Sequence, residues 1–153
     1  MEHLGNINNR EIIYQKHGLE VNWAKTIPNN NWLLFALVGS DNTDILDEVA
    51  RKAIDNNVCY ACCAGTSGKK MHDLIDENLV IRELEIEKNF LPSHQVITTW
   101  HESIEDGLWF ALNCAFNETV IIEKVYCLEI DKSSSKKGIE ELIDKFSAGY
   151  IPE

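Results

Sequence analysis

The stretch Val96-Ile97-Thr98-Thr99-Trp100-His101-Glu102, followed directly by Ser103-Ile104-Glu105-Asp106-Gly107-Leu108, decides how the chain is interpreted. Its first half is apolar and β-branched, which is typical of a buried strand. Ser103 is a good helix N-cap, and Asp106 three residues later resembles a capping box with Asp in place of Glu or Gln. The stretch predicts a strand that runs through a polar Trp-His-Glu segment into a helix, a junction where open α/β folds place their chemistry.

Further strands are predicted on both sides of this junction. The near-continuous apolar run Trp32–Gly39 lacks polar alternation, as expected of a central strand covered on both faces, and Val58–Ala64 repeats the pattern. Another strand is predicted within 119–130, most clearly over 125–130. Apolar residues at helical spacing follow each strand. Helices are therefore predicted over 44–56, from Met71 onward, from Ser103 onward, and around 139–146.

This alternation of strands and helices predicts an α/β fold: a three-layer domain with a mainly parallel four-stranded sheet, flavodoxin-like or Rossmann-like. Right-handed crossovers place the carboxyl end of every strand at the same edge. We expect the strand order 2-1-3-4, within a single domain over residues 32–153. Residues 1–31, which end in Pro28 and three asparagines, are predicted to be an N-terminal arm or cover segment. Within this segment, Glu11–Gln15 fits either a short helix or an edge strand.

Composition limits the classes of partner. The 153 residues include 14 basic and 25 acidic side chains, for a net charge of −11. Because such a surface repels phosphates and anionic lipids, we expect no nucleic acid and no membrane partner, whereas a basic protein partner would be complementary. Solubility alone is the alternative explanation of the charge. The five cysteines and the absence of an apolar leader predict a cytoplasmic protein with free thiols.

Two motifs resemble ligand sites without completing them. Cys59-x-x-Cys62-Cys63 lies in a predicted strand, where Cys59 and Cys62 point to opposite faces, and no second cysteine pair completes a zinc site. We therefore predict no metal and no cofactor, with these cysteines acting as small buried apolar residues. The turn Gly65–Lys70 resembles a phosphate cradle but lacks the spacing of a P-loop, so a plain tight turn is favoured.

The candidate site consists of the polar residues just past the strands. In the order 2-1-3-4, the ends of the first and third strands meet at the switch point and form one crevice. His101 is the candidate general base, oriented by Asp41 or Glu102, whose charge would raise the pKa of His101. Cys63 is a candidate nucleophile if a nearby imidazolium lowers its pKa. The candidate ligand-binding residues are Ser40, Trp100 and Glu102.

A purely structural interpretation of the same residues is the alternative. Trp100 then caps the core at the sheet edge, His101 bonds a backbone group, and Glu102 stabilises the start of the helix through the macrodipole. Polar residues gather at strand ends in any α/β domain, so position alone does not decide between the two interpretations.

A family resemblance adds to this reading. The segments Tyr60-Ala61-Cys62, Met71-His72-Asp73, Thr98–Glu102 and Leu108–Ala115 are similar to those of a family of small, functionally uncharacterised bacterial α/β domains, over roughly residues 32 to 130. Thr-Thr-Trp-His-Glu followed by Leu-Trp-Phe is the most specific part. The resemblance implies a bacterial source and a single domain, and it assigns no catalytic residues.

Two classes of function follow. The first is a non-enzymatic acidic binding protein, of the immunity-protein type, that sequesters a basic partner. The second is a small α/β enzyme or ligand-binding domain that uses a strand-end crevice around Asp41, Cys63 and His101. The two differ in whether the acidic side chains gather on one face or the polar strand-end residues converge within hydrogen-bond reach.

Overall fold

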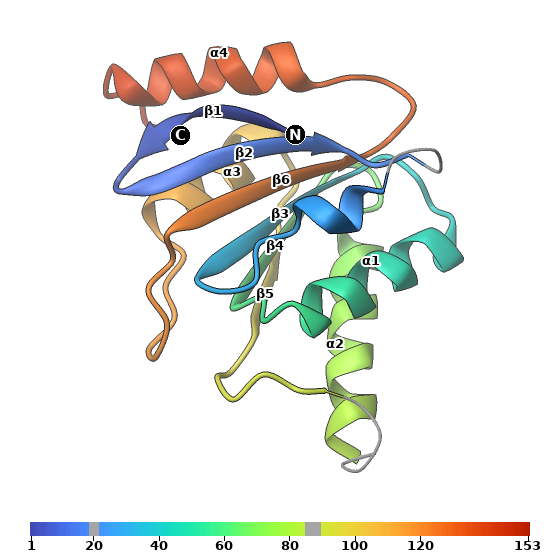
Figure 1. Ribbon diagram of the computed structural model, residues 1–153. Helices are drawn as coiled ribbons and strands as arrows, with labels where there is room; N and C mark the ends of the chain where they lie inside the picture. Colours follow the sequence, from blue (N-terminus) through green and yellow to red (C-terminus); the bar gives the residue numbers. More distant parts are fainter. Residues whose placement is uncertain (19–21, 85–89) are drawn as a thin grey trace.

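The computed structural model describes residues 1–18, 22–84 and 90–153 of the chain (Figure 1). Its elements, in chain order, are β1 (Glu2–Ile7), β2 (Arg10–Lys16), the short 3-10 helix η1 (Trp23–Thr26), β3 (Trp32–Val38), α1 (Thr43–Asp55), β4 (Tyr60–Ala64), α2 (Gly68–Leu84), β5 (Ile97–Trp100), α3 (Ile104–Asn113), β6 (Lys124–Ile130) and α4 (Lys136–Ser147).

The strands form one sheet in the order β1-β2-β6-β3-β4-β5. Neighbours from β2 to β5 pair in parallel, and β1 pairs antiparallel with β2 at one edge. The predicted α/β class and the mainly parallel sheet are therefore confirmed. The predicted count of four strands is wrong, because the described chain contributes six strands to this sheet.

The two additional strands come from residues 1–31, the predicted arm or cover segment. Asn8 and Asn9 adopt left-handed backbone angles, with φ of 52° and 61°, and so reverse the chain between β1 and β2. Asparagine tolerates this conformation better than most residues. The strand β2 then pairs with β6, from Glu11 opposite Lys124 to Lys16 opposite Glu129. The strands β1 and β2 thus extend the sheet itself.

The predicted strand order 2-1-3-4 is also wrong. The four predicted strands correspond to β3, β4, β5 and β6, and the structure arranges them as β6-β3-β4-β5. The crossovers through α1 and α2 carry the chain in one direction across the sheet, and α3 returns it past β3 to β6. The winding therefore reverses between β3 and β6, which makes this pair of strands the topological switch point.

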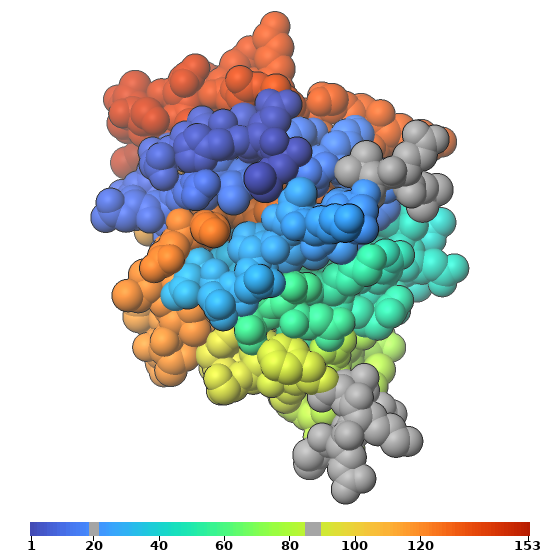
Figure 2. Space-filling view, viewed as in Figure 1, coloured from blue at the N-terminus to red at the C-terminus, as the bar shows by residue number. Residues whose placement is uncertain are grey.

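The sheet lies between two helical layers, and each face has its own apolar core. One core combines side chains of α1 and α2 with alternate residues of β3, β4 and β6, among them Leu34, Ala36 and Cys63. The other combines side chains of α3 and α4, such as Leu112, with the intervening residues of the strands, such as Phe35 and Cys62. All seven residues of β3 are buried, as predicted for a strand covered on both faces. Figure 2 shows the N-terminal strands, in dark blue, against the red C-terminal helix.

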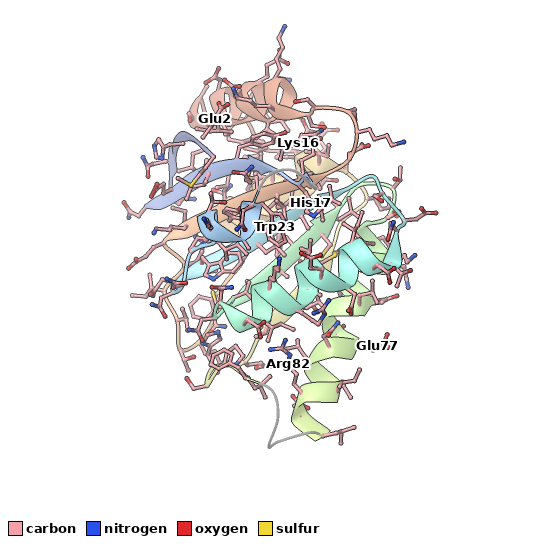
Figure 3. The ribbon with its side chains drawn as sticks, turned by 45° about the vertical axis from the view of Figure 1, so that its right-hand side comes forward. Glu2, Lys16, His17, Trp23, Glu77 and Arg82 are labelled. Carbon is pink, nitrogen blue, oxygen red and sulfur yellow. The ribbon has the colours of Figure 1, made fainter. Side chains whose placement is uncertain are left out.

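Polar contacts fix the helices in place. The Ser103 hydroxyl accepts a hydrogen bond from the Asp106 backbone N–H at 3.1 Å, which confirms the predicted N-cap of α3. Arg82 is buried and joins α2 to α1, because its guanidinium donates to the Asp55 carboxylate at 2.7 Å (Figure 3). None of the helices in the described part of the chain combines the length and the apolar character that crossing a bilayer requires.

Candidate functional site

A hollow of about 470 Å³ opens at the carboxyl edge of the sheet, between the ends of β2, β6 and β3. This is the switch point, where open α/β sheets characteristically bind their ligands. Two backbone hydrogen bonds hold the strand ends together there, since the N–H groups of Gly39 and Ser40 both donate to the Ile130 carbonyl. We name this hollow the switch-point crevice; its polar lining residues are His17, Ser40, Asp41, Asp131 and Lys132.

Asp131 extends from the end of β6 over the backbone of Gly39. A side chain at position 39 would collide with the Asp131 carboxylate, so glycine is what permits this approach. The carboxylate accepts hydrogen bonds from the Ser133 hydroxyl at 2.9 Å and the Lys132 N–H at 2.6 Å. These bonds hold the pKa of Asp131 below its ordinary value, so the side chain is anionic at neutral pH.

The loop between β3 and α1 supplies the opposite wall of the crevice. Asn42 caps α1 by accepting from the Ile45 N–H at 3.2 Å, and its own N–H donates to the Ser40 hydroxyl, also at 3.2 Å. Lys70 donates to the carbonyl of Asp41 at 2.5 Å, which ties this loop to the start of α2. Ser40 and Asp41 are thus held at the end of β3 by both neighbouring helices.

His17 closes the crevice at the end of β2. Its ring lies 5.5 Å from that of Trp23, and Figure 3 shows the two side chains together beside α1. Burial lowers the pKa of His17, with Glu48 opposing the shift and Lys52 adding to it. At neutral pH the imidazole is therefore uncharged, and it offers the crevice a neutral donor or acceptor rather than a positive charge.

A second, smaller hollow of about 190 Å³ lies on the α3 and α4 side of the same strand ends. It shares Gly39 and Asp131 with the switch-point crevice, so the two spaces meet at this pair. We name it the Glu129 hollow; its lining includes Leu37, Thr66, Ile104, Glu129, Asp131 and Ser135.

Glu129 is the most unusual residue of the site, because its carboxyl group is almost completely buried, with 1% of the residue exposed. The Tyr14 hydroxyl donates to one oxygen, and the Ser135 N–H lies 2.9 and 3.0 Å from the two oxygens. Burial, followed by the hydrogen bond to Glu129, raises the pKa of Tyr14 to about 12, so Tyr14 keeps its proton and acts as a donor.

The predicted site residues divide into two groups. Ser40 and Asp41 line the switch-point crevice. Trp100 is the last residue of β5, and His101 and Glu102 follow it. This strand lies on the other side of β4 and is not a neighbour of β3. The shared crevice predicted from the order 2-1-3-4 is therefore not formed, because β4 separates the two strand ends.

Cys63 lies on β4, between those two groups, and is fully buried in the core beneath α1 and α2. Burial raises the pKa of its thiol well above the ordinary value. A nucleophilic cysteine needs the opposite shift, so the environment of Cys63 does not provide the activation that the sequence hypothesis required.

His101 is partly buried and contacts its own side of the sheet. Its Nε2 lies 2.9 Å from the Thr99 hydroxyl, its backbone N–H donates to the Cys63 carbonyl at 2.8 Å, and its ring packs on Phe110. Burial lowers the pKa of His101, and Asp106 only partly opposes the shift. The predicted rise in the pKa of His101, through Asp41 or Glu102, is therefore wrong.

The two lysines at the start of α2 bind other groups of the protein. Lys69 pairs with Asp73 at 3.0 Å, and Lys70 binds the Asp41 carbonyl. Gly65 has a φ of +97° and lies against the backbone of Val38, which explains the glycine as a tight-turn residue. Across the described ranges, no group of three or more His, Cys, Asp or Glu side chains is arranged to hold a metal ion.

Sequence reasoning missed Tyr14, His17 and Glu129. Tyr14 and His17 lie in or just after β2, a segment whose sequence fits a short helix as well as an edge strand. Glu129 carried a usable signal, because it is the one charged residue in the apolar run 125–130. A charge inside a buried strand, close to its carboxyl end, indicates a functional position more often than a charge in a loop does.

Together, the fold and the crevice define a small α/β domain whose polar hollows lie at the switch point of a mostly parallel sheet. The chain belongs to the family described as Domain of unknown function (DUF7684), whose model matches residues 12–146, from β2 to the last turns of α4. No curated protein and no solved structure matches the chain.

Proposed function

We propose that this protein is a ligand-binding domain that takes a small polar molecule into the switch-point crevice. The observation that carries the proposal is the position of the two hollows, which meet at Gly39 and Asp131 between the carboxyl ends of β6 and β3. Ligand pockets commonly measure about 300–1,000 Å³, and the crevice falls within that range.

The chemistry of the lining favours binding over catalysis by a nucleophile. The crevice presents the carboxylates of Asp41 and Asp131, the neutral imidazole of His17 and the hydroxyl of Ser40. The ammonium group of Lys132 also lines it, but the lining still offers more hydrogen-bond acceptors than donors. The buried thiol of Cys63 remains protonated and lies away from the crevice. A ligand rich in hydrogen-bond donors is therefore the best complement.

A fragment screen followed by amide NMR shifts tests the proposal. Small polar fragments should shift the amides of Gly39, Ser40 and Asp131, and Gly39→Val should abolish the effect because its side chain enters the space that Asp131 occupies. Gly138→Val is the matched control, since position 138 on α4 has open space around it. The proposal fails if no fragment shifts these amides, or if Gly39→Val binds as the natural chain does.

A second candidate function is the capture of a basic protein partner, and the open edge of the sheet at β5 favours it. The strand β5 ends the sheet, and its last residue, Trp100, is 44% exposed. Exposed carboxylates of Asp73 on α2 and Glu102 after β5 lie on the elements that flank it. An open strand edge with an aromatic side chain and acidic neighbours suits a basic extended segment, which would add to the sheet.

The test of this second candidate uses an alternating Lys-Val octapeptide as the probe. Binding should shift the amides of Thr98 and Trp100, whose positions lie along β5, and should weaken in the variant Trp100→Ala. Glu140→Gln on α4 is the matched control, because it removes an exposed charge on another element. Equal binding by both variants would contradict this function.

A further inference from the structure

We infer that the Glu129 hollow is a cation subsite, which receives a primary ammonium group at the end of a short apolar chain. The inference rests on the proposed ligand-binding function and specifies the chemical class of the ligand. Glu129 is the central residue of this subsite, because it is a buried carboxyl group whose hydrogen-bond partners are neutral.

The first step concerns charge. A carboxylate removed from water is stable only when other groups replace the lost solvation, and buried carboxylates are usually paired with a cation. The partners of Glu129 are both neutral, namely the Tyr14 hydroxyl and the Ser135 N–H. Within the described residues, none of the ion pairs includes Glu129. The N-terminus of α4 therefore supplies a partial positive charge through Ser135, but no cationic side chain in this part of the chain pairs with Glu129.

The second step concerns hydrogen bonding. Tyr14 and Ser135 both donate to Glu129, so the two carboxyl oxygens act as acceptors, as they do in an ionised carboxylate. A carboxylate has about four acceptor positions, and these two donors leave room for another. Because Tyr14 and Ser135 fix the side chain, the acceptor is oriented before any ligand arrives.

The third step concerns the space beside Glu129. The hollow has an apolar wall from Leu37 and Ile104, with Asp131 at the boundary to the switch-point crevice. Its volume of about 190 Å³ admits a short chain but not a large ring system. An alkyl ammonium matches these properties, because its charge reaches Glu129 while its methylene groups lie against the apolar side chains.

The final step concerns the whole molecule. With a net charge of −11, the protein raises the local concentration of cations around it. Asp131 borders both hollows and is anionic at neutral pH, so a ligand that spans the two hollows meets a second carboxylate. The remainder of a larger ligand can then occupy the switch-point crevice.

An NMR titration with n-butylammonium chloride tests the inference, with butan-1-ol as the uncharged comparison. The ammonium should produce saturable shifts at the Ser135 amide and at the carboxyl carbon of Glu129, and butan-1-ol should not. Glu129→Gln should weaken the binding of n-butylammonium at least tenfold, because the amide keeps the shape but loses the charge. Glu140→Gln, an exposed carboxylate on α4, is the matched control and should bind normally.

The outcomes separate the inference from the proposed function. If n-butylammonium shifts only the amides of Ser40 and Asp41, or binds Glu129→Gln equally well, the cation subsite is overturned and the crevice remains a ligand site. If the fragments of the wider screen also leave both hollows unperturbed, the proposed function fails as well. Should Glu129→Gln not fold, Ile104→Trp fills the hollow without changing its charge, and normal n-butylammonium binding by that variant overturns the inference.

Discussion

The carboxylate of Asp131 lies so close to Gly39 that a Cβ at position 39 would overlap it. Asp131 follows β6 and Gly39 follows β3, so this contact joins the two strands between which the winding of the sheet reverses. The same pair borders both hollows. The absence of a side chain at residue 39 therefore determines where the carboxylate points and how the two spaces connect.

Replacing Gly39 by alanine should displace Asp131 and raise its pKa toward the ordinary value. The pKa is lowered chiefly by the hydrogen bond from the Ser133 hydroxyl and next by the Lys132 N–H, and a displaced carboxylate loses both. The measurement is the titration of the Asp131 carboxyl carbon by NMR. Gly138→Ala should leave that titration unchanged, because a Cβ at position 138 meets nothing within 4 Å. An unchanged midpoint in Gly39→Ala would contradict this account of the site.

Leu112→Ala should destabilise the protein by about 2–5 kcal/mol, because it leaves a cavity in a packed core. Leu112 is fully buried on α3 and belongs to the apolar cluster between the sheet and the α3–α4 layer. Urea unfolding at neutral pH measures the loss. Leu84→Ala is the control, since Leu84 is 79% exposed and its replacement should change stability by no more than about 0.5 kcal/mol. A loss below about 1 kcal/mol in Leu112→Ala would show that α3 contributes little to the core.

The elements after residue 31 could be predicted because their signals are local. Uninterrupted apolar runs mark β3 and β4, and Ser103 marks the start of α3 through a hydrogen bond that spans three residues. The local signal of β2 is ambiguous, because Glu11–Gln15 fits a short helix as well as an edge strand. Its place depends on pairing with β6, more than a hundred residues later, in the register that puts Tyr14 opposite Cys127.

The site could be predicted only in part for the same reason. Ser40 and Asp41 lie at the carboxyl edge because every parallel strand ends there, whatever the order of the strands. The neighbours of Asp41 depend on that order, and no local pattern determines it. A change from 2-1-3-4 to 4-1-2-3 exchanges the end of β5, with His101, for the end of β6, with Asp131.

The cysteines should differ sharply in reactivity. Burial raises the pKa of Cys62 and Cys127 to about 12 and that of Cys59 to about 11, and it also raises the pKa of Cys63. Cys114, at the end of α3, is exposed. An aromatic disulfide reagent at pH 8 should therefore titrate one thiol quickly and the others only after unfolding.

Cys114→Ser provides the control for that experiment, because it should abolish the fast phase without altering the slow one. Two or more fast thiols in the natural protein would show that the core opens near the sheet on the timescale of the reaction.

The stability of the protein should fall as the pH drops below about 6.5, in part because of His101. Burial lowers the pKa of His101 in the folded state, so the unfolded chain binds a proton first, and the stabilisation present above about pH 6.5 is lost as the pH falls through the folded value. Four carboxyl groups also have lowered pKa values, but they stay ionised in this pH range and lose their stabilising effect only at more acidic pH; they belong to Asp47, Glu48, Asp73 and Asp131.

Urea unfolding at pH 7.5 and 5.5 measures how much stability is lost over this range. The loss should be smaller for His101→Gln than for the natural chain, and His17 should account for part of the loss that remains. An NMR midpoint for His101 above 6.5, or an unchanged pH dependence in His101→Gln, would contradict the burial of this ring between Thr99 and Phe110.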